Sequence, residues 1–546
     1  MKNGRLKKLL SLGLSLAMVL SLAACGGTSD TAEDTDTSSA DSGETTEVKT
    51  YDTETGFSDI IDWTLYPVGD KPRIIVTTDG EADDMNSMRH LLLYADEFDI
   101  VGLIYSASQH HWQGDGEHKL SEITEDYLCK GLGYDEEPGE LLECRPQEEG
   151  WIEKEIEQYR EDYVNLVQND PDYPTADELL ATVKIGNWLF EGDVREETEG
   201  SNLIKDAILD DVDQKLFLQS WGGFNTVARA LLSIYEEYGD TDQWDEIYTK
   251  VCNKVVIQNK EQDTAYKNYI ADIYPDLVCL GGAGNQFGYY TSVKGEESYI
   301  KYFQADWLKE NIKFNHGALM SAYGLLGDGT YYVGETAPAQ YGTDMSLVGD
   351  EYSEYDWLGE GDSICWVVLL DRGLRGLETM NLGTWGGRLT INGVEENRNN
   401  DYKELDPNTG KLSGYSGRRF NPVLMEDWAA KADWAVSSYE DANHAPVVEA
   451  ENLDLTAAAG ETVSMAATVS DPDNDEVDQT WWVYTWECEY DGDKDALDLD
   501  SSSDGAATFT LPSDAAAGDY FVVMLEVKDQ ADAPMTRFAQ FVITVE

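Results

Sequence analysis

The spacing of apolar positions predicts a strand, a helix and a second strand at the start of the folded part of the chain. Residues 73–77 form a mostly apolar and β-branched run, as in a short buried strand. Apolar residues then recur at helical spacing from Met85 to Ala95, and a second apolar run covers residues 98–105. This order predicts a β-loop-α-β unit, from which parallel sheets are built.

The first loop of this unit is acidic. It carries Asp79, Glu81, Asp83 and Asp84. In open α/β sheets, ligands bind at the carboxyl ends of the strands. Four crowded carboxylates repel one another unless a cation lies between them, and oxygen ligands suit a hard cation such as Ca²⁺ or Mg²⁺. The alternative is a solvated acidic turn that caps a helix.

The spacing of these aspartates resembles the calcium motif of the nucleoside hydrolases, Asp-x-Asp-Pro-Gly-x-Asp-Asp. Asp79, Asp83 and Asp84 match its last three aspartates, whereas Thr77 replaces the first and Gly80-Glu81 replaces Pro-Gly. These departures indicate a divergent branch, and the chain resembles the nucleoside hydrolase-like family labelled as cellulose-binding. The fold class implied is α/β, a mostly parallel sheet flanked by helices, with a C-terminal all-β immunoglobulin-like sandwich.

Two later segments extend this resemblance. Residues 221–228 resemble the segment Gly-Pro-Leu-Thr-Asn-Ile-Ala, whose first polar residue gives its backbone carbonyl to calcium, and Asn225 takes that position. Residues 360–362 align with the segment that supplies the last calcium ligand, here Asp362. The resemblance therefore implies that Ca²⁺ is bound by Asp79, Asp84, Asp362 and the carbonyl of Asn225. Gly361 stands where those enzymes often have a histidine, so a leaving-group acid is missing there.

Roles for the other candidate residues come partly from this resemblance and partly from the chemistry of their side chains. Asp79 is the expected catalytic residue, because it would accept the proton of the attacking water. Histidine can donate a proton near neutral pH, and tryptophan offers a flat face to a sugar ring. A polar surface loop with a packed tryptophan is the alternative for residues 110–112, and a structural role is the alternative for His316. The expected substrate-binding residues are Asp83, His110, His111, Trp112, Trp221, Gln262, Asp263, His316, Glu360, Trp385 and Arg388.

The pattern changes in the last fifth of the chain. Residues 71–395 form the expected nucleoside hydrolase-like domain, and residues 396–445 a polar and then helical connecting segment. Residues 446–546 show short alternating runs separated by turn signals, which predict the β-sandwich. Trp482, Tyr484 and Trp486 would share one face, either as core or as a platform for a glycan. The Asp-rich turn at 471–475 could hold calcium, although tight turns alone favour these residues.

The N-terminus has the features of an exported lipoprotein. Residues 1–24 combine a basic start with an apolar run too short to span a membrane, and Leu22-Ala23-Ala24-Cys25 resembles a bacterial lipobox. We expect a lipid anchor on Cys25 that holds the protein on the extracellular face of the membrane; a cleaved, unlipidated signal is the alternative. Residues 25–50 are almost devoid of apolar side chains and are expected to form a disordered acidic tether.

Composition narrows the classes of partner. The 546 residues include 107 acidic and 38 basic ones, for a formal charge of −69. Such a charge would repel nucleic acid and favours cation binding. Six cysteines besides Cys25 show no zinc-ligand spacing, so we expect free, buried thiols; pairing of Cys129 with Cys144 is the alternative.

The expected function is a calcium-dependent hydrolase of N- or O-glycosidic bonds on the cell surface, acting on a carbohydrate or nucleoside-like small molecule. The alternative is a surface protein that binds polysaccharide, such as an insoluble cellulose-type glycan, without turnover. The glycine at 361 favours this alternative. A third hypothesis is a structural surface protein whose acidic sites only bind calcium.

Overall fold

The structure is a computed structural model. It describes residues 69, 71–129, 137–280, 287–288, 299–332, 345–391, 397–399, 404–405, 407, 410, 415–503 and 505–546. The expected signal peptide at 1–24, the tether at 25–50 and the lipidated Cys25 lie outside the described residues. No helix in the described ranges is long and apolar enough to span a membrane.

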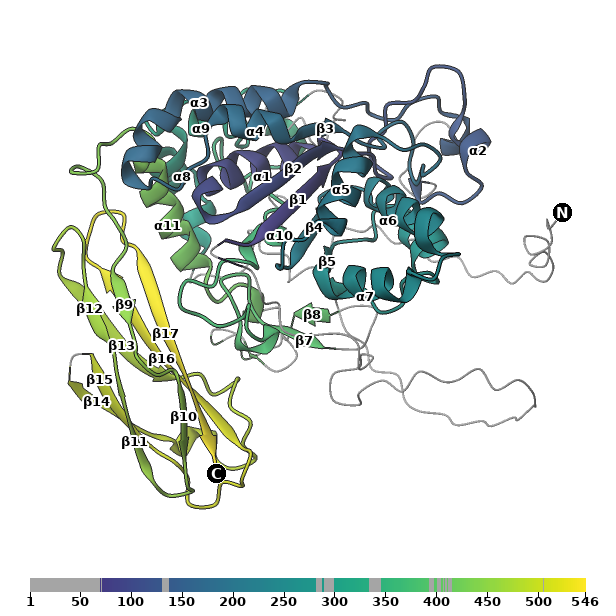
Figure 1. Cartoon of the computed structure of the whole chain (residues 1–546). Helices are drawn as coiled ribbons and strands as arrows, with labels where there is room; N and C mark the ends of the chain where they lie inside the picture. Colours follow the sequence, from purple (N-terminus) through teal and green to yellow (C-terminus); the bar gives the residue numbers. More distant parts are fainter. Residues whose placement is uncertain are drawn as a thin grey trace. The chain divides into compact units, whose positions relative to one another are not determined.

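A central sheet organises the α/β part of the chain (Figure 1). Among the described residues it has eight strands in the order β3-β2-β1-β4-β5-β6-β8-β7. Every neighbouring pair is parallel except β7 with β8. The strands are β1 (Arg73–Thr78), β2 (Asp99–Tyr105), β3 (Val183–Ile185), β4 (Leu216–Ser220), β5 (Val255–Gln258), β6 (Val278–Leu280), β7 (Leu389–Ile391) and β8 (Asn397–Asn399).

The order of the strands creates a switch point between β1 and β4. The chain proceeds outward from β1 to β2 and β3, then returns to β4 on the other side of β1 and proceeds outward again to β5 and β6. Thr77 and Ser220 lie side by side near the ends of β1 and β4. Because the connections diverge here, the carboxyl ends of these two strands are where ligands bind in open α/β sheets.

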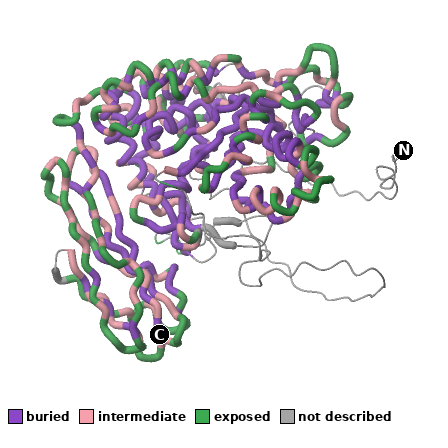
Figure 2. Tube along the Cα trace, viewed as in Figure 1, coloured by how far each residue is buried: buried purple, intermediate pink, exposed green. Residues whose placement is uncertain are grey.

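Helices cover both faces of the sheet (Figure 1). Right-handed crossovers place α1 and α6 on opposite faces, since they connect strands in opposite directions from the switch point. Every residue of β1 and of β4 is buried, as expected for parallel strands covered on both sides (Figure 2). The helices are α1 (Ala82–Leu93), α2 (Leu120–Ile123), α3 (Trp151–Asn169), α4 (Ala176–Thr182), α5 (Glu199–Leu209), α6 (Asn225–Tyr238), α7 (Trp244–Lys254), α8 (Ala305–Leu308), α9 (Gly317–Ala322), α10 (Ile364–Val367) and α11 (Asn421–Trp434).

The C-terminal part is the expected all-β sandwich. In the described residues, a four-stranded sheet β10-β17-β16-β13, a three-stranded sheet β11-β15-β14 and a pair β12-β9 enclose a separate apolar core. The strands are β9 (Val447–Glu449), β10 (Asp454–Ala457), β11 (Thr462–Ala466), β12 (Thr468–Ser470), β13 (Val477–Val483), β14 (Asp498–Ser503), β15 (Ala506–Thr510), β16 (Tyr520–Asp529) and β17 (Thr536–Val545).

The aromatic residues expected on one face of the sandwich differ in their surroundings. Tyr484 is buried, and the guanidinium of Arg419 lies 4.7 Å from its ring centroid and 4.6 Å from that of Trp482. Trp486 is 37% exposed. Tyr484 therefore packs inside the protein, Trp482 is half-buried, and Trp486 presents an exposed ring.

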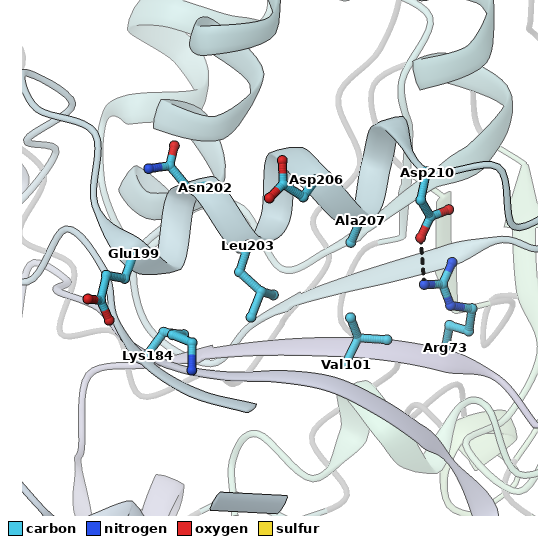
Figure 3. Close-up of a pocket in the computed structure, with 9 residues that line it drawn as sticks. All are labelled: Arg73, Val101, Lys184, Glu199, Asn202, Leu203, Asp206, Ala207 and Asp210. Atoms are coloured by element: carbon cyan, nitrogen blue, oxygen red, sulfur yellow. Dashed lines mark hydrogen bonds and ion pairs between the residues drawn. The ribbon is translucent and has the colours of Figure 1, made fainter. Parts of the chain in front are cut away.

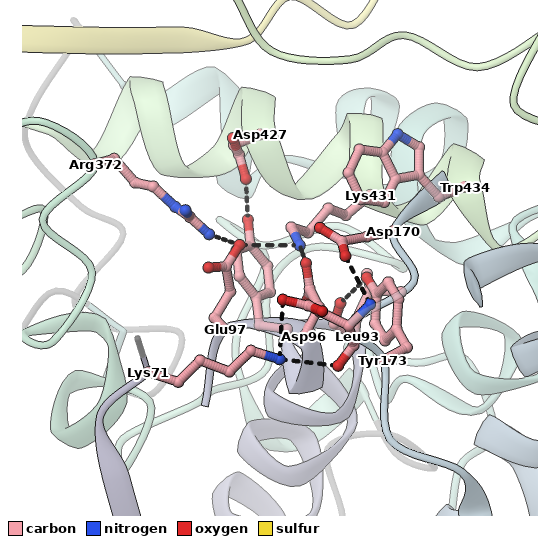
Figure 4. Close-up of polar contacts among 12 residues, drawn as sticks. Lys71, Leu93, Asp96, Glu97, Asp170, Tyr173, Arg372, Asp427, Lys431 and Trp434 are labelled. Atoms are coloured by element: carbon pink, nitrogen blue, oxygen red, sulfur yellow. Dashed lines mark hydrogen bonds and ion pairs between the residues drawn. The ribbon is translucent and has the colours of Figure 1, made fainter. Parts of the chain in front are cut away.

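A buried charge network joins α11 to the end of α1 (Figure 4). The side chain of Lys431 is 1% exposed and forms an ion pair with Asp96, which is 2% exposed, and with Glu97 at 3.2 Å. Glu97 also pairs with Arg372, and Lys431 lies 4.8 Å from the ring centroid of Tyr94. Burial lowers the pKa of Lys431, and Asp96 counteracts this effect. The network fixes the connecting helix to the α/β part.

The six cysteines of the described region are buried free thiols, as expected: Cys129, Cys144, Cys252, Cys279, Cys365 and Cys488.

Candidate functional site

Five carboxylates gather at the carboxyl end of β1. We call Asp79, Glu81, Asp83, Asp84 and Asp362 the acid cluster. Asp79 follows β1 directly, Asp83 and Asp84 lie in the first turn of α1, and Asp362 precedes α10. Asp79 and Asp84 are 0% exposed, Asp362 5% and Asp83 8%. Four of the five are thus buried, which excludes the solvated acidic turn as a description of this loop.

The acid cluster consists of two overlapping groups. One oxygen each of Asp79, Glu81 and Asp84 lie within 4.8 Å of one another, and the same holds for Asp83, Asp84 and Asp362. Both carboxylate oxygens of Asp79 and the Oδ2 of Asp84 are buried and have no hydrogen-bond partner, whereas the Oδ1 of Asp84 accepts a hydrogen bond from Thr78. Burying a carboxylate oxygen without a hydrogen-bond donor costs free energy, and such oxygens are suitable ligands for a hard divalent cation. The residues therefore fit Ca²⁺.

The pKa values respond to this crowding. Burial, followed by the charge of Glu81, raises the pKa of Asp79. The pKa of Asp84 is raised well above its usual value by burial and then by Asp79, Asp362 and Asp83. Burial and the charge of Asp83 likewise raise the pKa of Asp362. A cation among these carboxylates would offset their mutual repulsion and lower their pKa values.

Glu81 is tied to the loop that follows β2. Its Oε1 lies 3.3 Å from the Nε2 of His111 and 3.4 Å from a guanidinium nitrogen of Arg145, and the Nδ1 of His111 lies 2.6 Å from the carbonyl oxygen of Arg145. Burial acts against the charged form of Glu81, yet the hydrogen bond and charge of His111 lower its pKa. Neither Glu81 nor Arg145 was among the expected site residues. The signal in the sequence for Glu81 was its place among the four carboxylates of the first loop.

Asp362 is held in place by a loop fastened to α1. The side-chain amide of Asn86 donates to the carbonyl oxygens of Gly359 and Gly324, each at 3.0 Å. The Nδ1 of His90 lies 2.8 Å from Oε2 of Glu360. These contacts arise from the residues one and two turns after Asp83 on the same helix. They hold the loop of Asp362 against the helix that carries Asp83 and Asp84.

Glu360 itself is fully buried. Besides His90, its carboxylate accepts hydrogen bonds from Tyr323 and Ser363. On the other side of Asp362, Gln219 and Gln258 at the ends of β4 and β5 both donate to the carbonyl oxygen of Cys365. In the structure Glu360 therefore anchors the loop of Asp362. Its expected contact with substrate stays a prediction.

A side chain at position 361 would meet the carboxylate of Asp83. A Cβ at this position would lie 2.5 Å from the Oδ2 of Asp83. An imidazole could enter only if Asp83 moved. The absence of a leaving-group acid at this position is thus built into the packing of the acid cluster, and the imidazole nearest to Glu81 comes from His111.

The glycine turn after β4 closes the site from the other side of the switch point. A Cβ on Gly222 would lie 2.7 Å from the Cβ and Cγ of Asp79, so glycine allows this close approach. Asn225 begins α6, where its N–H donates to Asp263 at 2.8 Å and its Oδ1 accepts from Ser106. These partners concern its N–H and side chain, and the carbonyl ligand at this residue stays a prediction.

The other expected residues of this region line the same end of the sheet. Asp263 caps α6, and burial raises its pKa to about 7. The carbonyl of Gln262 accepts a hydrogen bond from Gln109, in the loop that carries His110 and His111. Trp112 is buried with its ring centroid 5.4 Å from that of Phe190, and Trp221 is buried with its Nε1 donating to Gln219. Both indole rings are packed against the protein, and their expected contact with substrate stays a prediction.

Three expected residues have partners elsewhere. His316 lies between the carbonyl oxygen of Glu310 at 2.8 Å and Asp433 of α11 at 3.0 Å, which is the structural alternative. Arg388 forms ion pairs with Glu487 of the sandwich and, at 3.6 Å, with Glu404. Trp385 is buried three residues earlier. The contacts of these residues do not include the acid cluster.

A groove of about 750 Å³ runs along α5 (Figure 3). Its lining includes Arg73, the first residue of β1. Asp79 lies at the opposite end of this strand, directly after its last residue. Arg73 and Asp210 form an ion pair at 2.9 Å across it. None of the acid-cluster residues contributes to the groove, so it is a feature separate from the candidate site.

The sheet with its switch point, the acid cluster and the appended sandwich define a nucleoside hydrolase-like protein. Residues 73–389 match the family described as "Cellulose-binding Sde182, nucleoside hydrolase-like domain", and residues 462–545 match "Cellulose-binding protein Sde0182, C-terminal domain". The chain belongs to this family. No curated protein matches it significantly.

One solved structure shares the fold. It is a nucleoside hydrolase-related hypothetical protein from Saccharophagus degradans that is associated with carbohydrate metabolism; it is 22% identical, with a TM-score of 0.62, and the match covers 88% of this chain and 100% of that one. The effector protein XOO4466 is 9% identical with a TM-score of 0.31, over 67% of this chain and 93% of that one. The first likeness confirms the predicted fold class, and the second is too weak to add to it.

Proposed function

We propose that the chain is a calcium-dependent hydrolase of N- or O-glycosidic bonds in a carbohydrate or nucleoside-like substrate. The observation that carries this proposal is Asp79, whose buried carboxylate has no hydrogen-bond partner and lies at the carboxyl end of β1 beside the switch point. A carboxylate in such a place can accept a proton from a water held next to the substrate. The carbohydrate association of the related S. degradans protein and the cellulose-binding label of the family support a sugar-containing substrate.

Each residue of the acid cluster has a role in this proposal. Calcium held by Asp79, Asp84 and Asp362, with the carbonyl of Asn225, would lower the pKa of a bound water and hold sugar hydroxyls. Asp79 accepts the proton of the attacking water. Asp83 faces Gly361, and its carboxylate hydrogen-bonds a sugar hydroxyl. The surrounding carboxylates stabilise the positive charge that develops on the sugar ring.

A second candidate function is binding of a polysaccharide without turnover. Gly361 favours it, because no acid stands at this position and Asp83 blocks the space for one. The family label favours it as well. Turnover distinguishes the two functions, and the Discussion gives the test.

We also propose that Cys25 carries a lipid and anchors the protein to the extracellular face of a bacterial membrane. The support is the lipobox-like sequence after the apolar run. Labelling with a radioactive fatty acid tests it: the intact chain should be labelled, and Cys25→Ser should not.

Excess calcium should stabilise the fold. A ligand that binds only the native state adds RT ln(1 + [L]/Kd), about 2.7 kcal/mol at a hundredfold excess over Kd. Thermal unfolding with EDTA and with CaCl₂ measures the shift of Tm. Asp362→Ala should lose a large part of it, whereas Asp473→Asn, in the acidic turn of the sandwich, should retain most of it. The same midpoint with EDTA and with calcium would remove the metal site from the proposal.

A further inference from the structure

The acid cluster contains more carboxylates than one cation requires, and their arrangement is uneven. Ca²⁺ lies 2.3–2.6 Å from its oxygen ligands, so two ligands of one ion are at most about 5 Å apart. The oxygens of Asp79, Glu81 and Asp84 meet this limit, and so do those of Asp83, Asp84 and Asp362. Each group therefore has the size of one coordination sphere. The expected ligands Asp79 and Asp362 fall in different groups.

Only Asp84 belongs to both groups. It is 0% exposed, its Oδ1 is bonded to Thr78, and its Oδ2 is buried without a hydrogen-bond partner. Asp79, in one of the groups, has two further buried oxygens without a partner. The lack of hydrogen-bond partners for these oxygens is an observation separate from the closeness of the carboxylates. It indicates that the protein does not itself supply the groups that these oxygens would bind.

Charge leads to the same conclusion. The five carboxylates carry five negative charges when ionised. One divalent cation would leave three of them uncompensated in a buried site, and two would leave one. Arg145, 3.4 Å from Glu81, supplies the last positive charge. Since unpaired buried charges are strongly destabilising, a second cation would complete the balance with all five carboxylates ionised.

We propose that the acid cluster holds two hard divalent cations, of the class of Ca²⁺, with Asp84 as the ligand shared between them. One site consists of Asp83, Asp84 and Asp362, and the other of Asp79, Glu81 and Asp84. This inference rests on the proposed function for the presence of calcium in the cluster, and it adds a second site that depends on Glu81. His111 and Arg145 position Glu81 through its Oε1.

The stoichiometry of binding tests the proposal, with Ca²⁺ alone as the probe. The full chain carries a third acidic group in the sandwich, Asp471, Asp473 and Asp475. Titration calorimetry at physiological ionic strength should therefore use a background of Asp473→Asn and Asp475→Asn, which removes that group. Salt at this concentration also screens loose association of calcium with the acidic surface.

We expect two calcium ions per chain in this background, and one after Glu81→Gln. Asp362→Asn should also leave one, from the other site, and Asp84→Asn should leave none that binds tightly. One ion per chain, unchanged by Glu81→Gln, would overturn the second site and leave the proposed function intact. No binding at all would overturn both. Glutamine keeps the size of Glu81; a second variant, Glu81→Ser, should give the same loss, and the metal-free Tm of each variant confirms folding.

Discussion

Asp79→Asn is expected to reduce turnover of the true substrate by about 10²- to 10⁴-fold, with a much smaller change in sugar affinity. Asparagine has nearly the shape of aspartate but cannot accept the proton of the attacking water. The carboxylate it replaces is buried, and its oxygens have no other hydrogen-bond partner, so no neighbouring group is bonded there to take over. Weaker metal binding would add to the loss.

The assay should screen nucleosides and small glycosides near neutral pH with calcium present. Asp475→Asn, an exposed carboxylate in the sandwich, is the matched control and should keep full activity. Plain nucleosides should be poor substrates, because Gly361 cannot protonate a leaving base. Rapid nucleoside turnover would contradict the role given to Gly361. No turnover of any glycoside, with sugar binding indifferent to Asp79→Asn, would favour the polysaccharide-binding function.

Lys431→Met should destabilise the protein by about 3–5 kcal/mol, because it leaves a buried carboxylate without its partner. Lys431 and Asp96 are almost completely buried, and Glu97 retains Arg372 when the lysine is lost. Methionine fills most of the space of the lysine stem. The loss therefore measures the unpaired charge of Asp96 and not a cavity.

Urea unfolding of Lys431→Met, of Asp96→Asn and of the double mutant gives the coupling energy between the two side chains. Asp96→Asn combined with Lys431→Met should recover most of the loss, since no unpaired charge remains. Lys528→Ala is the control: its ion pair with Glu426 is 36% exposed at the lysine and should be worth about 1 kcal/mol or less. A similar small loss for Lys431→Met would show that the buried pair contributes little.

The local parts of the fold could be predicted from the sequence. The run at 73–77 became β1, the helical spacing after Met85 became α1, and the apolar run at 98–105 contains β2. Hydrophobic periodicity suffices for these elements because their burial is set by their own side chains. The three aspartates of the first loop could be placed at one end of the sheet for the same reason.

Residues whose role depends on distant partners could not be placed this way. His316 and Arg388 lie in local motifs that suit a binding site, yet their partners are Asp433 and Glu487, which no local spacing connects to them. Glu81 is the reverse case. The acidic loop pointed to Glu81 as part of a cation site, but its ion pair with Arg145 could not be predicted, because Arg145 lies in a segment without regular periodicity.

The contact between Asn86 and Gly359 has a consequence for the order of folding. These residues are 273 positions apart, and together they bring Asp362 to the loop after β1. At a synthesis rate of about 5–20 residues per second, the loop after β1 exists for tens of seconds before Gly359 and Asp362 have been synthesised. Closing so long a loop occurs late, after the intervening strands have paired. Tight calcium binding is therefore a property of the finished chain, and fragments that end before Gly359 should lack it.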